Sequence, residues 1–195
     1  TPKAVRYVRL YITNPGSDNC ARIPEFEVRG TSDGMNEDTP IGINLARSAT
    51  QWPTDSSYGP EWTGAKAIDG WCNSGSKWCT TNASSTHWLA LDLGASKPVN
   101  GFVVKHAGAG GEDTYYNTKA FKLQSATSLS GPWTDECVVD NGMQANTTVR
   151  SYNTAKNLRY VRLYITNSGI DNYARIPEFE VWGSNASTVR SVKSM

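Results

Sequence analysis

Aromatic side chains in polar loops are the first residues of this sequence that could take part in chemistry. Segments rich in Gly, Ser, Thr and Pro contain seven of them: Trp52, Trp62, Trp71, Tyr58, Tyr115, Tyr116 and Tyr173. An exposed ring loses solvation unless a partner covers it, and the C–H face of a sugar packs well on an aromatic plane. These residues indicate a sugar-binding surface. The alternative, that each ring folds back onto the end of its domain, stays open.

Four cysteines could form disulfides or bind a metal. Cys72 and Cys79 enclose Asn-Ser-Gly-Ser-Lys-Trp, and a bond between them would stabilise the fold by about 2.5 kcal/mol. Zinc is a poorer interpretation because CxxC spacing and paired histidines are missing; two buried thiols are the other alternative. Cys20 and Cys137 are the remaining pair, whose bonding the sequence leaves open. A disulfide implies an oxidising compartment, so we predict a secreted, extracellular protein.

Catalytic residues are hard to assemble from this sequence. A glycosidase needs two carboxylates about 5–10 Å apart in a cleft, but the acidic residues here are scattered over strand ends and turns. A catalytic triad would need His87 or His106 as its base, and no G-x-S-x-G motif accompanies either of them. We therefore predict a binding protein that is not an enzyme.

Composition argues against two classes of partner. The chain has 19 Lys and Arg against 18 Asp and Glu, a net charge of +1, so no strong positive field attracts nucleic acids or anionic membranes. No apolar run approaches the roughly 18 residues of a membrane-spanning helix, and no signal peptide opens the chain. We predict neither a nucleic-acid partner nor a membrane partner.

The elements that must position these residues are strands. Apolar and polar residues alternate in RYVRLYIT (159–166), WLALDLG (88–94) and FEVWG (179–183), as in a strand with one buried face. The predicted buried set is Val161, Leu163, Ile165, Leu89, Leu91, Leu93, Phe179 and Val181. Loops rich in Gly, Ser, Asn and Pro separate these runs, and no segment of ten or more residues has a helical period. We predict an all-β, antiparallel β-sandwich.

One segment of the chain occurs twice. Residues 4–30 and 157–183 are identical at 21 of 27 positions. Their offset is about one domain long, so the simplest interpretation is a tandem array in which the first copy ends a preceding domain. We divide the chain into a β segment that repeats the closing strands, a linker, the main domain and a tail: residues 1–33, 34–41, 42–184 and 185–195. Because unpaired strands aggregate, we expect the first segment to dock by strand addition on the sandwich or on another copy of the chain. It would then bury Leu10, Ile12, Phe26 and Val28.

Five motifs follow one another in order: NLARSAT (44–50), AKAIDGWCNSGSKWCT (65–80), WLALDLG (88–94), NTKAFKLQSATSLSGPWT (117–134) and RYVRLYIT…ARIPEFEVWG (159–183). Together they resemble a discoidin domain, the coagulation factor V/VIII C-type domain, and most of all carbohydrate-binding module family 32. The resemblance implies a discoidin-like jelly roll with its ligand-binding loops at one end. It also implies a module without catalytic activity, appended to a glycoside hydrolase or polysaccharide lyase.

The resemblance further implies a structural calcium ion. The positions that match its ligands are the side chains of Asp69, Ser76 and Glu178 and the carbonyls of Lys66, Trp71 and Pro177. Such an all-oxygen shell suits calcium. An insertion before Trp78 would also allow Asn73 to replace Trp71. The alternative is that the Asp caps its own turn and the Glu pairs with a basic neighbour such as Arg175.

The resemblance assigns sugar-binding roles by position. His106 ends a strand where relatives have Arg or His, Asn117 follows where they have Asn, and Tyr173 lies where they have a loop aromatic. With the other loop aromatics, the predicted carbohydrate-binding set is Trp52, Trp62, His106, Tyr116, Asn117 and Tyr173. We expect the two tryptophans and the three matched positions to converge at one end of the sandwich. The alternatives are a His that closes a strand and an Asn that forms an Asx turn.

These observations predict a non-catalytic carbohydrate-binding module that targets a secreted polysaccharide-degrading enzyme to its glycan. The partners would be a polysaccharide or oligosaccharide and, in the full-length protein, a tandem copy or a catalytic domain. The alternative is a discoidin-type adhesion domain that binds a phospholipid surface or a protein. Such a domain would present apolar side chains among basic residues at its loop tips, whereas these loops are rich in Gly, Ser, Asn and Thr.

Overall fold

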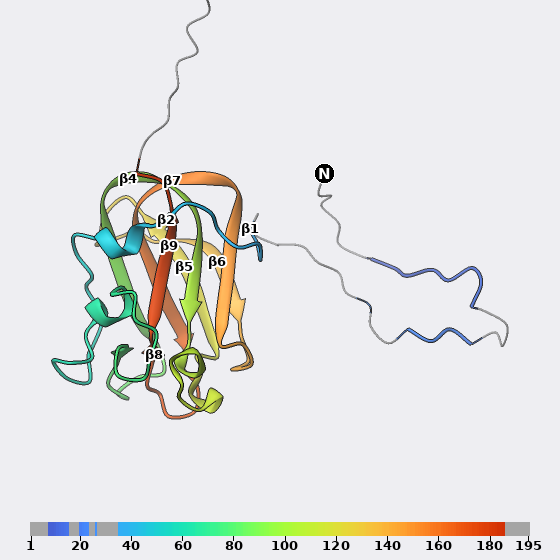
Figure 1. Cartoon of the computed structure of the whole chain (residues 1–195), viewed down its shortest axis with the longest axis horizontal. Coiled ribbons are helices and arrows are strands. Elements are labelled where there is room, and N and C mark those ends of the chain that lie inside the picture. Colours follow the sequence, from blue (N-terminus) through green and yellow to red (C-terminus); the bar gives the residue numbers. More distant parts are fainter. Residues whose placement is uncertain (1–7, 16–19, 24–25, 27–34, 186–195) are drawn as a thin grey trace, which may run out of the picture. The chain divides into compact units, whose positions relative to one another are not determined.

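The computed structural model describes residues 8–15, 20–23, 26 and 35–185 (Figure 1). The chain divides into two units, Thr1–Ser32 and Asp33–Met195. The described strands all belong to the second unit: β1 (Met35–Asn36), β2 (Ile43–Asn44), β3 (Trp78–Cys79), β4 (His87–Lys105), β5 (Ala120–Ala126), β6 (Thr134–Asp140), β7 (Thr147–Asn167), β8 (Arg175–Ile176) and β9 (Glu178–Gly183). Four short 3-10 helices join them: η1 (Leu45–Ser48), η2 (Gly64–Ala67), η3 (Ala107–Gly110) and η4 (Thr114–Tyr116). The predicted all-β fold is confirmed.

The sheet is antiparallel throughout, in the order β2-β9-β4-β7-β5-β6, with β1 added beside β7. Strands β3 and β8 form a separate pair. This antiparallel arrangement agrees with the predicted β-sandwich.

The two long strands β4 and β7 run through both layers of the sandwich. They pair along both halves, and the register shifts between Asp92 and Lys97. Gly94 lies at this shift with φ of 83°, a left-handed conformation that favours glycine. Figure 1 shows both strands turning over at the end where they are labelled, so the two ends of β4 point toward the other end, where β8 lies. The loops around β8 are therefore assembled from distant parts of the chain.

The core lies between the layers and contains the predicted apolar set. All eight predicted side chains are buried: Leu89, Leu91, Leu93, Val161, Leu163, Ile165, Phe179 and Val181. Burying each side chain of this size contributes about 1.5–3 kcal/mol. Trp78 joins this core, whereas Trp88 and Trp133 are only half-buried. The guanidinium of Arg162 lies 4.3 Å from the ring centroid of Trp133.

The domain begins before residue 42, where we had predicted its start. Met35 is buried in the core, and it pairs with Tyr152 at the sheet edge. The Asp38 carbonyl accepts a hydrogen bond from Ser151 Oγ at 2.6 Å. Much of the predicted linker 34–41 is therefore part of the sandwich.

The N-terminal repeat differs from the copy within the domain. Leu10, Ile12 and Phe26 are 46%, 37% and 51% exposed, and the docking of this segment by strand addition stays a prediction. In the domain, β7 is flanked by β4 and β5, and the repeated segment contains no counterpart of either strand. Its predicted buried residue Val28 and the tail beyond residue 185 lie outside the described residues.

Candidate functional site: an aromatic groove beside the β3–β8 pair

A groove of about 330 Å³ is lined by three aromatic side chains, two cations and a thiol. Its lining residues are Tyr58, Trp62, Lys77, Cys79, Tyr173 and Arg175. They come from the loop before η2, from β3 and the residue that precedes it, and from β8 and the loop that leads into it. Aromatic faces beside a few polar groups are typical of a small-molecule site.

The register of β3 and β8 decides which side chains reach the groove. Trp78 pairs with Ile176, and both are fully buried. Because successive side chains on a strand point to opposite faces, the neighbouring pair, Cys79 and Arg175, lies on the groove side. One face of the β3–β8 pair therefore packs in the core, and the opposite face, with Cys79 and Arg175, lines the groove.

Backbone hydrogen bonds hold the aromatic loop against β3. The amide of Tyr58 donates to the Cys79 carbonyl (2.8 Å), and the amide of Cys79 donates to the Trp62 carbonyl (3.1 Å). On the opposite wall, the ring of Tyr173 meets that of Tyr58 edge-to-face, with centroids 5.8 Å apart. Both walls are therefore fixed before a ligand arrives.

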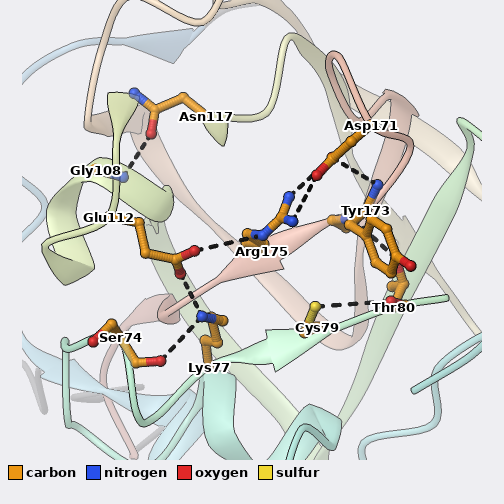
Figure 2. A network of polar contacts seen from close by, with 11 residues as sticks. Ser74, Lys77, Cys79, Thr80, Gly108, Glu112, Asn117, Asp171, Tyr173 and Arg175 are labelled. Atoms are coloured by element: carbon orange, nitrogen blue, oxygen red, sulfur yellow. Dashed lines mark hydrogen bonds and ion pairs between the residues drawn. The ribbon is translucent and has the colours of Figure 1, made fainter. Parts of the chain in front are cut away.

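Figure 2 shows the polar network beside the groove, in which one carboxylate contacts two cations. Glu112 lies 2.5 Å from Lys77 Nζ and 3.5 Å from Arg175 Nε. Lys77 Nζ also donates to the Ser74 carbonyl at 3.0 Å. Arg175 donates two hydrogen bonds, of 2.9 and 2.6 Å, to the carboxylate of Asp171. These contacts pin β3, β8 and the segment between η3 and η4 to one another.

The same cations pack on aromatic rings. Lys77 Nζ lies 4.7 Å from the centroid of Trp62, and the Arg175 guanidinium lies 4.4 Å from Tyr116 and 5.2 Å from Tyr173. Burial opposes charge at Asp171, but the hydrogen bonds from Arg175 lower the pKa of its carboxyl. Both partners therefore stay ionised at neutral pH, which keeps the rings in place.

The structure brings together only part of the predicted sugar-binding set. Trp62 and Tyr173 line the groove, and Tyr116 packs on Arg175 beside it. Trp52 is 41% exposed, but it belongs to the segment that follows β4 through the bridge of Gln51 to Asp92 and does not line the groove. The predicted convergence is therefore incomplete.

His106 and Asn117, the two ligand contacts predicted from matched positions, are both fully buried in this structure. The Asn117 side chain accepts a hydrogen bond from the Gly108 amide (2.7 Å) and donates to Asn146 Oδ1 (2.9 Å). His106 Nε2 lies 3.0 Å from Thr148 Oγ1. Residues 107–116, which lie between them in the sequence, fold into η3 and η4, and these two buried residues support that segment from within.

Lys77 and Arg175 are the site residues that sequence reasoning missed. Arg175 entered only as a possible partner for Glu178, which it does not contact among the described ion pairs; it pairs with Asp171 and Glu112 instead. The signal that could have found both cations is the alternation of side chains along a strand. If Trp78 and Ile176 point into the core, their neighbours Lys77 and Arg175 point to the opposite face.

The three side chains of the predicted calcium shell lie around one loop. Ser76 Oγ donates to Asp69 Oδ2 at 2.5 Å, and the Gly70 amide donates to Glu178 Oε1. Asp69 Oδ1 also accepts from the Trp71 amide at 2.9 Å, the turn cap that was the alternative interpretation. The turn cap is therefore present, and the same carboxylate also accepts a hydrogen bond from Ser76.

Glu178 provides the observation that tests the fit of a cation. Glu178 is 1% exposed, and burial raises the pKa of its carboxyl to about 7. Lys105 opposes this shift, but Lys105 is ion-paired with Glu180 at 2.7 Å. Within the described residues, no group of three or more His, Cys, Asp or Glu could hold a metal. Two carboxylates and a hydroxyl fit a hard cation only if backbone carbonyls complete the shell.

The predicted disulfide between Cys72 and Cys79 is not formed in this structure, where both side chains are thiols. Cys72 Sγ donates to the Ala109 carbonyl of η3 at 3.3 Å, whereas Cys79 Sγ lies 3.7 Å from the Thr80 carbonyl. Burial raises the pKa of both thiols, which disfavours the reactive thiolate. Cys20 is exposed in the first unit, and Cys137 is buried in the second. Separately, no helix within the described ranges is long and apolar enough to cross a membrane.

Comparison with known proteins identifies the fold. The family model described as the F5/8 type C domain matches residues 51–179. No curated protein matches the sequence. Chitosan-binding module 2 from a chitosanase/glucanase of Paenibacillus sp. IK-5, solved with chitotriose, is 24% identical with a TM-score of 0.59. The alignment covers 72% of this chain and 100% of that module.

Two further solved structures are family 32 carbohydrate-binding modules. The module of EndoD from Streptococcus pneumoniae is 22% identical, with a TM-score of 0.56 and coverage of 70% of this chain and 98% of that one. The module of NanJ from C. perfringens, solved with galactose, is 14% identical, with a TM-score of 0.61 and coverage of 72% and 98%. At these identities the likeness shows the fold, and all three proteins are binding modules.

Proposed function

This chain belongs to the F5/8 type C domain family, and we propose that it is a non-catalytic glycan-binding module whose ligand lies in the groove beside β3 and β8. The observation that carries the proposal is the convergence of Tyr58, Trp62 and Tyr173 around one hollow of about 330 Å³. A sugar ring would pack its C–H face on an aromatic wall, and the cations at the groove would donate to its hydroxyl groups. Solved neighbours with the same fold bind chitotriose and galactose, which supports a glycan ligand.

Two tryptophan variants test this proposal. A glycan array first identifies a ligand, and titration calorimetry then compares Trp62→Ala with Trp52→Ala. We expect affinity in the micromolar to millimolar range, a loss of about tenfold or more for Trp62→Ala, and little change for Trp52→Ala, which lies away from the groove. Equal losses in the two variants would contradict the groove assignment, and a protein that binds no glycan would contradict the proposed function.

A phospholipid surface is the second candidate, favoured by four exposed apolar side chains in the loops around β8. They are Tyr58, Trp71, Tyr115 and Ile170. The net charge of +1 gives little attraction to anionic lipid. Co-sedimentation with phosphatidylserine vesicles separates the two functions, because a glycan-binding module stays in the supernatant. For such a module we also expect Trp71→Ala to leave the glycan affinity unchanged.

We also propose a calcium ion held by Asp69, Ser76 and Glu178 together with the carbonyls of Lys66, Trp71 and Pro177. The all-oxygen donor set and the buried Glu178 carboxyl support it. When bound, the ion would neutralise the carboxylates and hold the loop 69–76 in place. Scanning calorimetry tests this: millimolar calcium should raise Tm of the chelator-treated protein, and should not do so for Glu178→Gln. An unchanged Tm would contradict the proposal.

The proposed role is to hold a secreted polysaccharide-degrading enzyme on its substrate. The neighbour from Paenibacillus is itself derived from a chitosanase/glucanase, which supports such a host. The repeat of residues 157–183 at 4–30 supports a tandem neighbour in the full-length protein. Weak sites in tandem gain avidity through effective concentration, so a protein that contains both copies should bind an insoluble glycan more tightly than this chain does.

A further inference from the structure

The charges around the groove carry information about the sugar, provided that the groove binds glycans as proposed. The groove lining contains both cations of the network, Lys77 and Arg175, whereas the described lining residues include no carboxylate. Their partners Glu112 and Asp171 contact the cations from outside that lining. The side that faces a ligand is therefore positive, although the network as a whole is neutral.

Lys77 keeps a donor for the groove. An ammonium group carries three N–H donors, and two acceptors face it in the network, the Ser74 carbonyl at 3.0 Å and Glu112 Oε1 at 2.5 Å. Its nitrogen lies 4.7 Å from the centroid of Trp62, so an acceptor on a sugar that packs beside Trp62 would come within reach of the third N–H. Arg175 is committed more fully, since it donates two hydrogen bonds to Asp171.

The geometry points to an acidic sugar as the ligand: we propose that the groove selects a uronic acid whose carboxylate accepts a hydrogen bond from Lys77 while its ring packs beside Trp62. A carboxylate accepts stronger hydrogen bonds from an ammonium than a hydroxyl does. A cationic amino sugar meets the opposite situation, because its ammonium approaches two cations and finds no carboxylate in the lining. Selectivity here therefore differs from that of a chitosan-binding module of the same fold.

A matched pair of ligands tests the inference. Calorimetry compares a galacturonate trisaccharide with the same trisaccharide after its carboxylates have been reduced to alcohols, and a glucosamine trisaccharide serves as the cationic arm. We expect the acidic ligand to bind about tenfold more tightly than its reduced form, and the glucosamine ligand to bind most weakly. Added salt should reduce the preference, because it screens the charges.

Three variants locate the effect. Lys77→Met should remove the preference for the acidic trisaccharide, because it weakens binding of the acidic ligand far more than binding of the reduced one. Glu112→Gln keeps the shape of the side chain beside Lys77 but removes its negative charge. It should therefore enlarge the preference for the acidic over the reduced trisaccharide. Lys122→Met, whose ammonium pairs with Asp135 on the outer sheet face, should leave every affinity unchanged.

The outcomes separate this inference from the function on which it rests. Equal affinity for the acidic and the reduced ligand would overturn the inference and leave glycan binding in place. A preference that survives Lys77→Met would also overturn it. If no trisaccharide binds and a broad glycan array is empty as well, the proposed function fails and the inference fails with it.

Discussion

The two histidines lie at opposite ends of β4. His87 lies beside the loop that carries Tyr173 of the groove, and His106 lies beneath η3 and η4, so they allow these two regions to be compared. Both are buried. His87 Nδ1 lies 2.7 Å from Asp55 Oδ2, and its Nε2 lies 2.9 Å from the Asn172 carbonyl in the loop that carries Tyr173. His106 instead lies over Phe121, with ring centroids 5.6 Å apart, and contacts Thr148 Oγ1.

The difference appears in the proton affinities. Burial disfavours the charged form at both sites, but the hydrogen bonds to Asp55 and Asn172 outweigh it and raise the pKa of His87. At His106 burial acts without such an acceptor and lowers the pKa to about 4. The side next to the groove is therefore built from charged pairs, and the side beneath η3 and η4 is built from neutral packing and amide hydrogen bonds.

The largest expected effect comes from breaking the neutral side at Asn117. Asn117→Ala removes the acceptor of the Gly108 amide and the donor to Asn146, and leaves buried polar groups unpaired. We expect the free energy of unfolding to fall by about 4 kcal/mol, measured by urea denaturation. Asn153→Ala is the control, since Asn153 makes an exposed contact with Asn36; an equal loss there would contradict the argument.

The pH dependence of stability sharpens the comparison at His106. Because its folded pKa is below the unfolded value of about 6.5, its contribution is complete above pH 6.5 and is lost as the pH falls toward 4. Relative to His106→Gln, the wild type should lose about 3 kcal/mol across this window. The measurement is urea denaturation of both proteins at each pH. If the free energy of unfolding changed with pH in the same way for both, His106 would not be buried as described.

At His87 the stability should depend on pH in the opposite direction. The folded pKa of His87 is raised, so its stabilising contribution is complete below about pH 6.5 and is lost as the pH rises through the folded value. Asp55→Ala removes the stabilising contact with His87 and also the acceptor of the Trp88 amide (2.7 Å). We expect the free energy of unfolding to fall by about 2 kcal/mol at pH 6. The wild type and the variant should therefore converge as the pH rises; divergence would contradict the assignment.

The smallest effect is expected in the groove itself. Trp62 is half-buried and packs on Lys77 rather than on the core, so Trp62→Ala should cost about 1 kcal/mol of stability. A thermal melt checks this, and a loss as large as that of Asn117→Ala would place Trp62 among the structural residues.

The sequence predicted the sandwich well because one-sided burial leaves a period-2 pattern. Leu89, Leu91 and Leu93 are all buried as expected, and the five motifs led to the correct family. Loop aromatics were also informative, since Trp62 and Tyr173 line the groove. Local pattern and composition were enough at these positions.

The remaining site residues depend on contacts between distant segments, which spacing does not encode. His106 and Asn117 match ligand positions by sequence, yet both are fully buried in this structure. Lys77 and Arg175 meet through Glu112, and that contact joins three separate stretches of chain. Cys72 and Cys79 are close in sequence, but their sulfur atoms face different carbonyls.

The central claim, that a glycan lies in the groove beside β3 and β8, is tested most directly by NMR titration of the tryptophan indole N–H signals. The chain has seven tryptophans, of which only Trp62 lines the groove within the described part of the chain. A saturating oligosaccharide should shift the Trp62 indole signal, assigned from Trp62→Phe, and leave those of Trp52 and the buried Trp78 in place. A shift at Trp52 with none at Trp62 would contradict the claim.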